Sequence, residues 1–210
     1  MEILVDNINC MIDTVNRSIE FNDTVVGINK ARILGSSDQC YRVMYMVAQY
    51  FNVKKVLEIG THQGASAITF CQAIKDNNRV PEVHTVDNWT LQYKKIAQSN
   101  IDKSGFTDYI KMYDGASLIE VPKVLSNIGK VDIAFIDGKH TLDYIIGDYN
   151  NCKDFSDMIL FHDTEHGLTL GEESYFDTVR SDGYEIYNFK TKYVEGDSHL
   201  VGIALAIKHR

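Results

Sequence analysis

The sequence predicts a single α/β domain built on a doubly wound, mostly parallel sheet. Its 210 residues are 44% hydrophobic and 24% charged, which is enough apolar material for one full-sized core. From residue 55 onward, short apolar runs alternate with amphipathic segments of helical spacing. Polar residues and glycines follow several of these runs, as expected at the ligand-binding edge of such a sheet.

The chain before the first strand is predicted to be helical in two places. Apolar residues between Ile8 and Ile19 recur at spacings of three and four, which is typical of one helix face. We expect residues 1–36 to form a helical cap segment and residues 37–210 to form the main domain. A second helix, capped by Ser37 or Asp38, is expected to lead into the sheet.

Strands and helices are then expected to alternate. The expected strands cover residues 55–59, 83–87, 109–113, 131–136 and 158–161. The expected helices cover residues 65–75 and 91–101, a short segment opening at Pro122, and residues 142–149. Strands that alternate with helices of about 10 to 15 residues imply a parallel sheet covered on both faces.

The C-terminal part departs from this alternation. After a helix near residues 173–179, strands over 184–189 and 200–208 follow one another with no helix between them. Two consecutive strands joined by a loop predict an antiparallel pair. The complete sheet is therefore expected to have seven strands.

Composition excludes several classes of protein. The net charge of -8 is spread without blocks of like charge, which argues against nucleic acid as a partner. No apolar run approaches the roughly 18 residues of a membrane span, and no secretory signal is visible, so we expect a cytoplasmic protein. The four cysteines stand far apart, which favours reduced thiols over a zinc site or disulfides. The sequence leaves open whether the protein is a homo-oligomer.

A glycine-containing loop follows the first strand. Gly60 and Gly64 flank the turn into the next helix, so the backbone can approach a ligand while the helix N-terminus offers free N–H groups. A dinucleotide loop would need G-x-G-x-x-G, but position 62 is His, and Glu58 would repel phosphate. The loop therefore favours a cationic or neutral ligand.

The next two strand ends suggest a nucleoside. Asp87 ends the second strand, where an acid can accept hydrogen bonds from ribose hydroxyls, and Asn88 follows it. After the third strand come residues that suit the edge and face of an adenine, Asp114, Gly115, Ala116 and Ser117. Together these positions indicate a nucleoside without phosphates.

The fourth and fifth strand ends carry candidate catalytic groups. Asp137 and Asp163 would emerge from adjacent strands, where two carboxylates can share a hard divalent cation such as Mg²⁺. His162, beside Asp163, is a further candidate ligand. His140 would bring an imidazole to the same pocket, with a pKa suited to accepting a hydroxyl proton, so it is the candidate general base.

These motifs resemble those of the class I S-adenosylmethionine-dependent methyltransferases. Glu58, Gly60 and Gly64 match the first motif of that family, and the resemblance covers about residues 40–208. It implies a Rossmann-like fold with S-adenosylmethionine as the cofactor. The residues implied to surround that cofactor are Glu58, Gly60, Thr61, Gly64, Asp87, Asn88, Asp114, Gly115, Ala116, Ser117 and Asp137.

The later strand ends resemble the metal-dependent O-methyltransferases, particularly the branch with macrocin O-methyltransferase and other sugar-tailoring enzymes. Catechol-type relatives carry a lysine base three positions after the first metal Asp, and His140 stands there. The resemblance assigns Asp137 and Asp163 to the metal and His140 to the base. It implies a small-molecule acceptor with a sugar-like or vicinal-diol hydroxyl. Relatives often add a Glu or Asn ligand beside the second Asp, where this chain has His162 and Thr164.

Two alternatives stay open. A nicotinamide-dependent oxidoreductase on a similar sheet is disfavoured by the missing third glycine and by Glu58. A non-catalytic nucleoside-binding module is disfavoured because Asp137, His140 and Asp163 are present together.

Overall fold

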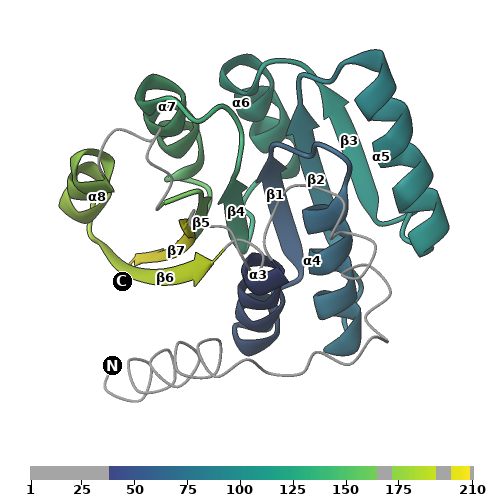
Figure 1. Ribbon diagram of the computed structural model, residues 1–210, viewed down its shortest axis with the longest axis horizontal. Coiled ribbons are helices and arrows are strands. Elements are labelled where there is room, and N and C mark those ends of the chain that lie inside the picture. The colour runs from purple at the N-terminus through teal and green to yellow at the C-terminus, as the bar shows by residue number, and fades with distance from the viewer. Residues whose placement is uncertain (1–37, 165–171, 193–199, 209–210) are drawn as a thin grey trace.

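A computed structural model describes residues 38–164, 172–192 and 200–208, and it places seven strands in one sheet (Figure 1). The strands are β1 (Lys55–Ile59), β2 (Glu82–Asp87), β3 (Ile110–Asp114), β4 (Ile133–Ile136), β5 (Met158–His162), β6 (Tyr184–Lys192) and β7 (Leu200–Lys208). Their order is β3-β2-β1-β4-β5-β7-β6. Strands β1 to β5 pair in parallel, whereas β7 is antiparallel to both β5 and β6. The predicted fold class and its antiparallel C-terminal pair are confirmed.

Helices cover both faces of this sheet (Figure 1). They are α3 (Asp38–Tyr50), α4 (Ala65–Asp76), α5 (Leu91–Ser104), α6 (Ser117–Ile128), α7 (Leu142–Cys152) and α8 (Glu172–Ser181). Because successive side chains of a strand point to opposite faces, Val56 packs with α3, α4 and α5, while Leu57 packs with α6, α7 and α8. The apolar strand runs of the sequence therefore serve two cores, one on each face.

The helix expected to open at Pro122 opens five residues earlier, at Ser117, so that prediction was wrong. Proline removes one backbone N–H, which would otherwise bond to the carbonyl of Leu118. That carbonyl lies in the first turn of α6, where Leu118 and Ile119 are exposed, so water can satisfy it. The helix tolerates the proline because the lost bond lies near its exposed end.

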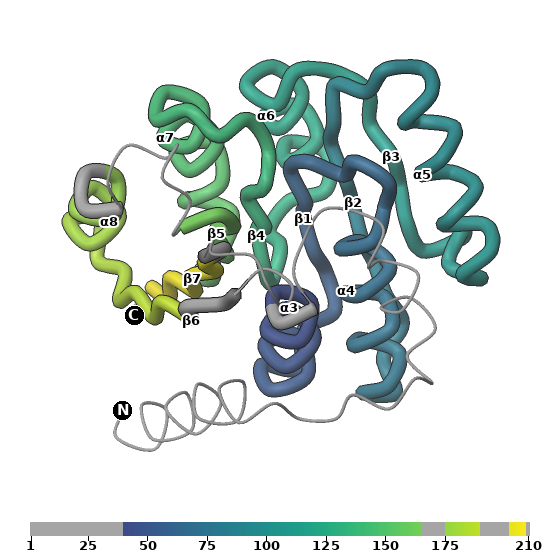
Figure 2. Tube along the Cα trace, in the orientation of Figure 1, coloured from purple at the N-terminus to yellow at the C-terminus, as the bar shows by residue number. Residues whose placement is uncertain are grey.

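The helix before the sheet, α3, lies alongside α4 (Figure 2). The cap segment expected at residues 1–36 lies outside the described residues, as does Cys10. Cys40, Cys71 and Cys152 are buried thiols, as expected of core cysteines. Within the described ranges, no helix is both long and apolar enough to cross a membrane.

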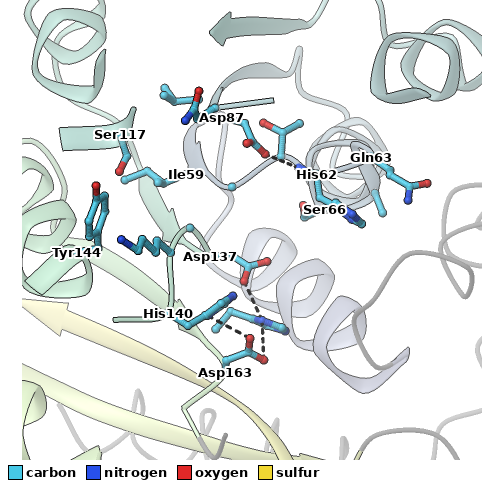
Figure 3. A pocket seen from close by; sticks show the side chains of 18 of the residues that line it. Ile59, His62, Gln63, Ser66, Asp87, Ser117, Asp137, His140, Tyr144 and Asp163 are labelled. Atoms are coloured by element: carbon cyan, nitrogen blue, oxygen red, sulfur yellow. Dashed lines mark hydrogen bonds and ion pairs between the residues drawn. The ribbon is translucent and has the colours of Figure 1, made fainter. Parts of the chain in front are cut away.

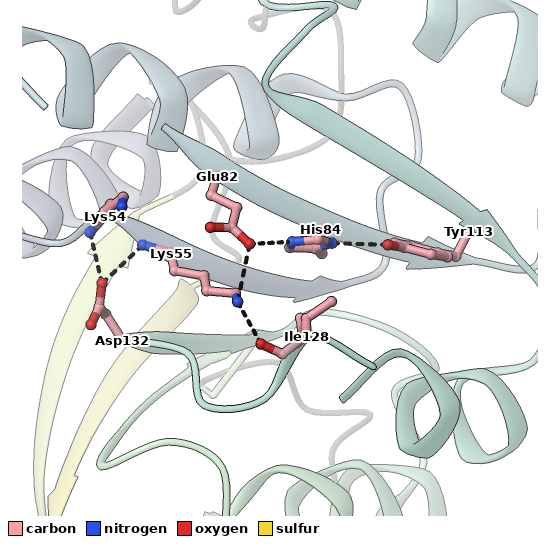
Figure 4. Close-up of polar contacts among 7 residues, drawn as sticks. All are labelled: Lys54, Lys55, Glu82, His84, Tyr113, Ile128 and Asp132. Atoms are coloured by element: carbon pink, nitrogen blue, oxygen red, sulfur yellow. Dashed lines mark hydrogen bonds and ion pairs between the residues drawn. The ribbon is translucent and has the colours of Figure 1, made fainter. Parts of the chain in front are cut away.

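A polar network joins the strands at their amino ends (Figure 4). The Asp132 carboxylate accepts a 2.9 Å hydrogen bond from the backbone N–H of Lys55, whose ammonium lies 3.0 Å from Glu82. His84 bridges Glu82, at 3.1 Å, and the Tyr113 hydroxyl, at 3.0 Å. These side chains satisfy one another, whereas the polar side chains at the opposite, carboxyl ends of the strands face a cavity.

Candidate active site

A cavity of about 620 Å³ opens at the carboxyl ends of the strands (Figure 3). This volume lies within the range of small-molecule sites. It brings together most of the site residues predicted from the sequence, namely Gly60, Thr61, Asp87, Asn88, Ala116, Ser117, Asp137, His140, His162 and Asp163. Four predicted residues do not line it: Glu58, Gly64, Asp114 and Gly115.

The loop after β1 is held in a shape that glycine permits. Gly60 has a φ of 95°, and a Cβ there would lie 1.9 Å from the carbonyl oxygen of Asp137. The N–H of Gly60 also donates a 2.9 Å hydrogen bond to the carbonyl of Val86. Only glycine allows this approach, which brings the loops after β1 and β4 together around the cavity.

Gly64 begins α4 in the left-handed conformation, with a φ of 89°. A Cβ at this position would lie 3.4 Å from Ile101 of α5, about an ordinary contact distance, so the left-handed backbone is what favours glycine here. No side chain caps the helix, and Ala65 and Ser66 of its first turn line the cavity. The N–H groups of this turn lack partners within the helix and can bind an anionic group.

Asp87 fixes the tip of the same loop. Its Oδ2 accepts a 2.7 Å hydrogen bond from the backbone N–H of His62, and the Trp89 indole donates to the His62 carbonyl at 3.1 Å. A carboxylate can accept several hydrogen bonds, so Asp87 can still accept from a ligand hydroxyl in the cavity. His62, which stands where a dinucleotide loop would have a glycine and was not predicted to belong to the site, also lines the cavity.

Glu58 lies beneath the loop, with none of its surface exposed. The Thr85 hydroxyl donates a hydrogen bond to its carboxyl group and also contacts the Thr61 hydroxyl. Burial raises the pKa of Glu58 to about 8, although hydrogen bonds from Ser66 and Thr85 oppose this. At neutral pH Glu58 is therefore mainly an uncharged acid that supports the loop from below.

Asp114 and Gly115 make their contacts outside the cavity lining. Asp114 forms a 2.7 Å ion pair with Lys94, and the Gly115 N–H donates to the Asp87 carbonyl at 3.0 Å. Direct cofactor contact by these two residues, and by Glu58 and Gly64, stays a prediction.

Acidic and histidine side chains meet at the ends of β4 and β5 (Figure 3). Ligand atoms of Asp137, His140 and Asp163 all lie within 4.8 Å of one another, and His140 Nδ1 is 3.2 Å from Asp163 Oδ2. The Asp163 backbone has a φ of 55°, a left-handed conformation that aspartate tolerates better than most residues. Sequence reasoning had predicted this meeting from the parallel order of the strands.

His162 lies behind these two carboxylates. Its Nδ1 is 3.0 Å from Asp137 and 3.1 Å from Asp163. Burial disfavours its charged form, but the Asp137 carboxylate and the hydrogen bonds that the imidazole donates to both carboxylates raise its pKa well above the ordinary value. His162 is not in the group of converging ligand atoms, and its buried cation offsets part of the negative charge of the two aspartates.

The donor set fits a divalent cation. Two carboxylates and one imidazole converge, and carboxylate oxygens are the ligands that Mg²⁺ prefers. Thr164, which stands where relatives of the resembled family often add a ligand, is buried, and its hydroxyl donates to Asn188 at 3.1 Å. A metal ion here would be held by Asp137 and Asp163, with His140 within reach.

Other residues line the cavity that the sequence analysis had not assigned to the site. The polar and aromatic ones besides His62 are Tyr41, Gln63, Ser66, Lys139 and Tyr144. The Lys139 ammonium lies 4.2 Å from the centre of the Tyr144 ring, so these two side chains contact each other in the cavity wall. The available signal for Ser66 was its position directly after the Gly60–Gly64 loop, in the first turn of α4.

Comparisons with known proteins identify the relatives of this chain. A family model described as a methyltransferase domain matches residues 57–164, just over half of the chain. A catechol O-methyltransferase from Niastella koreensis is 28% identical over 97 residues, which cover 46% of this chain and 42% of that protein. An uncharacterized protein from Sinorhizobium fredii is 25% identical over 131 residues, covering 55% of this chain and 14% of that protein. The chain thus spans less than half the length of these relatives.

Solved structures share the fold along nearly the whole chain. An O-methyltransferase from Bacillus cereus in complex with SAH has a TM-score of 0.73 at 16% identity, covering 90% of this chain and 93% of that one. The O-methyltransferase TomG from Streptomyces achromogenes, in complex with SAM, has a TM-score of 0.73 at 14% identity, covering 96% of each chain. At such identities the likeness establishes the fold.

Proposed function

The chain belongs to the methyltransferase-domain family, as its motifs predicted, and on that premise we propose that it transfers a methyl group from S-adenosylmethionine to a small-molecule hydroxyl. One observation carries this proposal. The same cavity holds residues suited to a nucleoside, Asp87 and Ser117, and the acid–histidine group of Asp137, His140 and Asp163 (Figure 3). A cofactor and an acceptor can therefore meet within it.

The cofactor would bind along the loops after β1, β2 and β3. Asp87 accepts hydrogen bonds from the ribose hydroxyls, and Ala116 and Ser117 contact the adenine. The uncapped N-terminus of α4 suits the carboxylate of the methionine part. The cofactor would supply an electrophilic sulfonium methyl group, and Asp87, Ala116 and Ser117 would hold its nucleoside part.

His140 is the proposed base. If its Nδ1–H is donated to Asp163, 3.2 Å away, the lone pair of Nε2 is left to accept a proton from the acceptor hydroxyl. Asp163 thereby fixes the tautomer and orientation of the imidazole. Positioning the oxygen in line with the methyl group then accounts for much of the rate, since well-oriented reactants gain about 7–11 kcal/mol.

Asp137 and Asp163 are the proposed metal ligands, with Mg²⁺ the expected ion. The metal would supply Lewis-acid stabilisation of the deprotonated hydroxyl. Although the sequence analysis placed His162 among the ligands, we now propose that it orients the two carboxylates from behind. An acceptor with two neighbouring hydroxyls suits such a site, and the catechol O-methyltransferase relative supports this choice.

The test is methyl transfer in a defined assay. The protein is incubated with S-adenosylmethionine and a panel of catechols and sugar diols, and formation of S-adenosylhomocysteine is measured by mass spectrometry. EDTA should abolish turnover and Mg²⁺ should restore it. Full activity in EDTA would contradict the metal role, and binding of NAD without binding of S-adenosylhomocysteine would favour the oxidoreductase alternative.

A further inference from the structure

A buried carboxylate lies just outside the residues assigned so far. Asp148, in the second turn of α7, is 1% exposed, and neither of its oxygens has a hydrogen-bond partner of normal geometry within the described residues. Buried polar groups are nearly always hydrogen-bonded, because leaving one unpaired costs about 1–3 kcal/mol or more. The position of Asp148 therefore calls for a functional explanation.

Asp148 lies behind the cavity wall at its nucleoside end. Its Oδ2 is 3.5 Å from the position that a Cβ of Gly138 would occupy, and Gly138 lines the cavity. A Cβ at Gly147 would lie 2.5 Å from Leu118, so the glycine lets α7 pack closely against the first turn of α6. Ser117 begins that turn and also lines the cavity. The carboxylate thus lies next to both wall residues.

The charge state of Asp148 depends on Ser117. Burial raises the pKa of Asp148 to about 6, and the Ser117 hydroxyl is the group that opposes this rise by stabilising the charged form. Above pH 6 the ionised carboxylate needs a donor. Ser117 carries a single hydroxyl proton, and rotation about its side-chain bonds can direct that proton toward Asp148.

We propose that Asp148 is a positioning residue that draws the Ser117 hydroxyl proton away from the cavity, so that Ser117 Oγ faces the bound base only as a hydrogen-bond acceptor. A hydrogen-bond acceptor at this point suits a purine whose exocyclic amino group donates to it. It disfavours a purine with a carbonyl at the same position, because two acceptors would then face each other. Asp148 would thus select a 6-amino over a 6-oxo purine. The inference rests on the proposed function, because it assumes that Ser117 contacts the adenine.

The experiment compares two ligands by calorimetry at pH 7.5 on the full chain: S-adenosylhomocysteine and its 6-oxo analogue, S-inosylhomocysteine. The wild-type protein should bind the amino compound roughly tenfold or more tightly, as one mispaired hydrogen bond requires. Asp148→Asn should bring the ratio of the two Kd values close to one, because its amide can donate to Ser117 and release the hydroxyl proton. Asp143→Asn, an exposed change on the same helix, should keep the wild-type ratio.

The ratio of the two Kd values distinguishes a positioning role of Asp148 from a purely structural one. Loss of a structural role would weaken the binding of both ligands by the same factor. Equal affinities in the wild type, or an unchanged ratio in Asp148→Asn, would overturn the inference. If Asp148→Asn does not fold, Ser117→Ala provides the second test, since it should lose the preference while Asp148 is retained. A wild-type preference that persists in Ser117→Ala also overturns it. If the wild type binds neither ligand, the proposed function itself fails.

Discussion

Glu58 provides a direct test of the buried polar network beneath the loop after β1. Its side chain is fully buried, and burial raises its pKa from 4.5 to about 8. Because the folded-state pKa is the higher one, the contribution of Glu58 to the stability of the native protein is largest below about pH 4.5. Stability is then lost as the pH rises from about 4.5 to about 8, and the loss levels off above that. Glu58→Gln keeps the shape, stays neutral and can still accept from Thr85, so it should remove this dependence.

The magnitude follows from the difference between the two pKa values. A difference of about 3.5 corresponds to about 5 kcal/mol at about 1.4 kcal/mol per pH unit, and about 4 kcal/mol of this falls between pH 5 and pH 9. Relative to the wild type, the free energy of unfolding of Glu58→Gln should therefore rise by up to about 4 kcal/mol over that range. Near pH 5 the two proteins should be similar.

Urea denaturation at pH 5, 7 and 9 measures the effect, with Glu82→Gln as a matched control on the neighbouring strand (Figure 4). Burial of Glu82 raises its pKa, but contacts with His84 and Lys55 outweigh this and lower it. The wild type should therefore hold its advantage over Glu82→Gln at neutral pH and lose it as the pH falls, the opposite sign to Glu58→Gln. Parallel pH curves for the wild type and Glu58→Gln would refute the reasoning.

Three further changes test the site. His140→Ala should lower kcat for methyl transfer by about 10²–10⁴-fold, while the Kd of S-adenosylhomocysteine from calorimetry stays within about twofold; equal losses in both would contradict its role as base. Asp163→Asn should raise the Mg²⁺ concentration needed for half-maximal turnover, and an unchanged Mg²⁺ titration would exclude it as a ligand. Gly60→Ala should lower Tm and abolish cofactor binding, because its Cβ would meet the Asp137 carbonyl at 1.9 Å. Gly105→Ala, with a similar φ of 79° but open space around it, should cost only about 1–2 kcal/mol in denaturation.

The strands were predictable because their signal is local. Residues 55–59 and 131–136 form short, mostly apolar runs, and the structure places strands there with ends shifted by at most two residues. The start of α6 was missed because Pro122 is typical of a helix start. Whether a helix can extend before a proline depends on whether water can reach the carbonyl that loses its hydrogen bond. The sequence does not show this exposure.

The residues of the candidate site also divide into those that the local sequence predicts and those that it does not. Asp87, Asp137 and Asp163 could be predicted because parallel strands bring their carboxyl ends to one edge whatever the details of packing. Tyr41 and Tyr144 come from α3 and α7, and whether a helix side chain reaches the cavity depends on how the helix is rotated against the sheet. That rotation is set by contacts between distant residues, which no short motif records.

The carboxyl groups that line the cavity differ in charge from Glu58, which lies behind it. Asp87, Asp137 and Asp163 line it, while Glu58 lies behind it and is held mainly neutral by burial. The lining acids give the cavity a negative potential that favours a cationic ligand and disfavours a phosphate. A sulfonium cofactor carries a positive charge that its thioether product lacks, so the same carboxylates should hold the cofactor more tightly than the product. The acids that select the methyl donor would therefore also promote release of the spent cofactor.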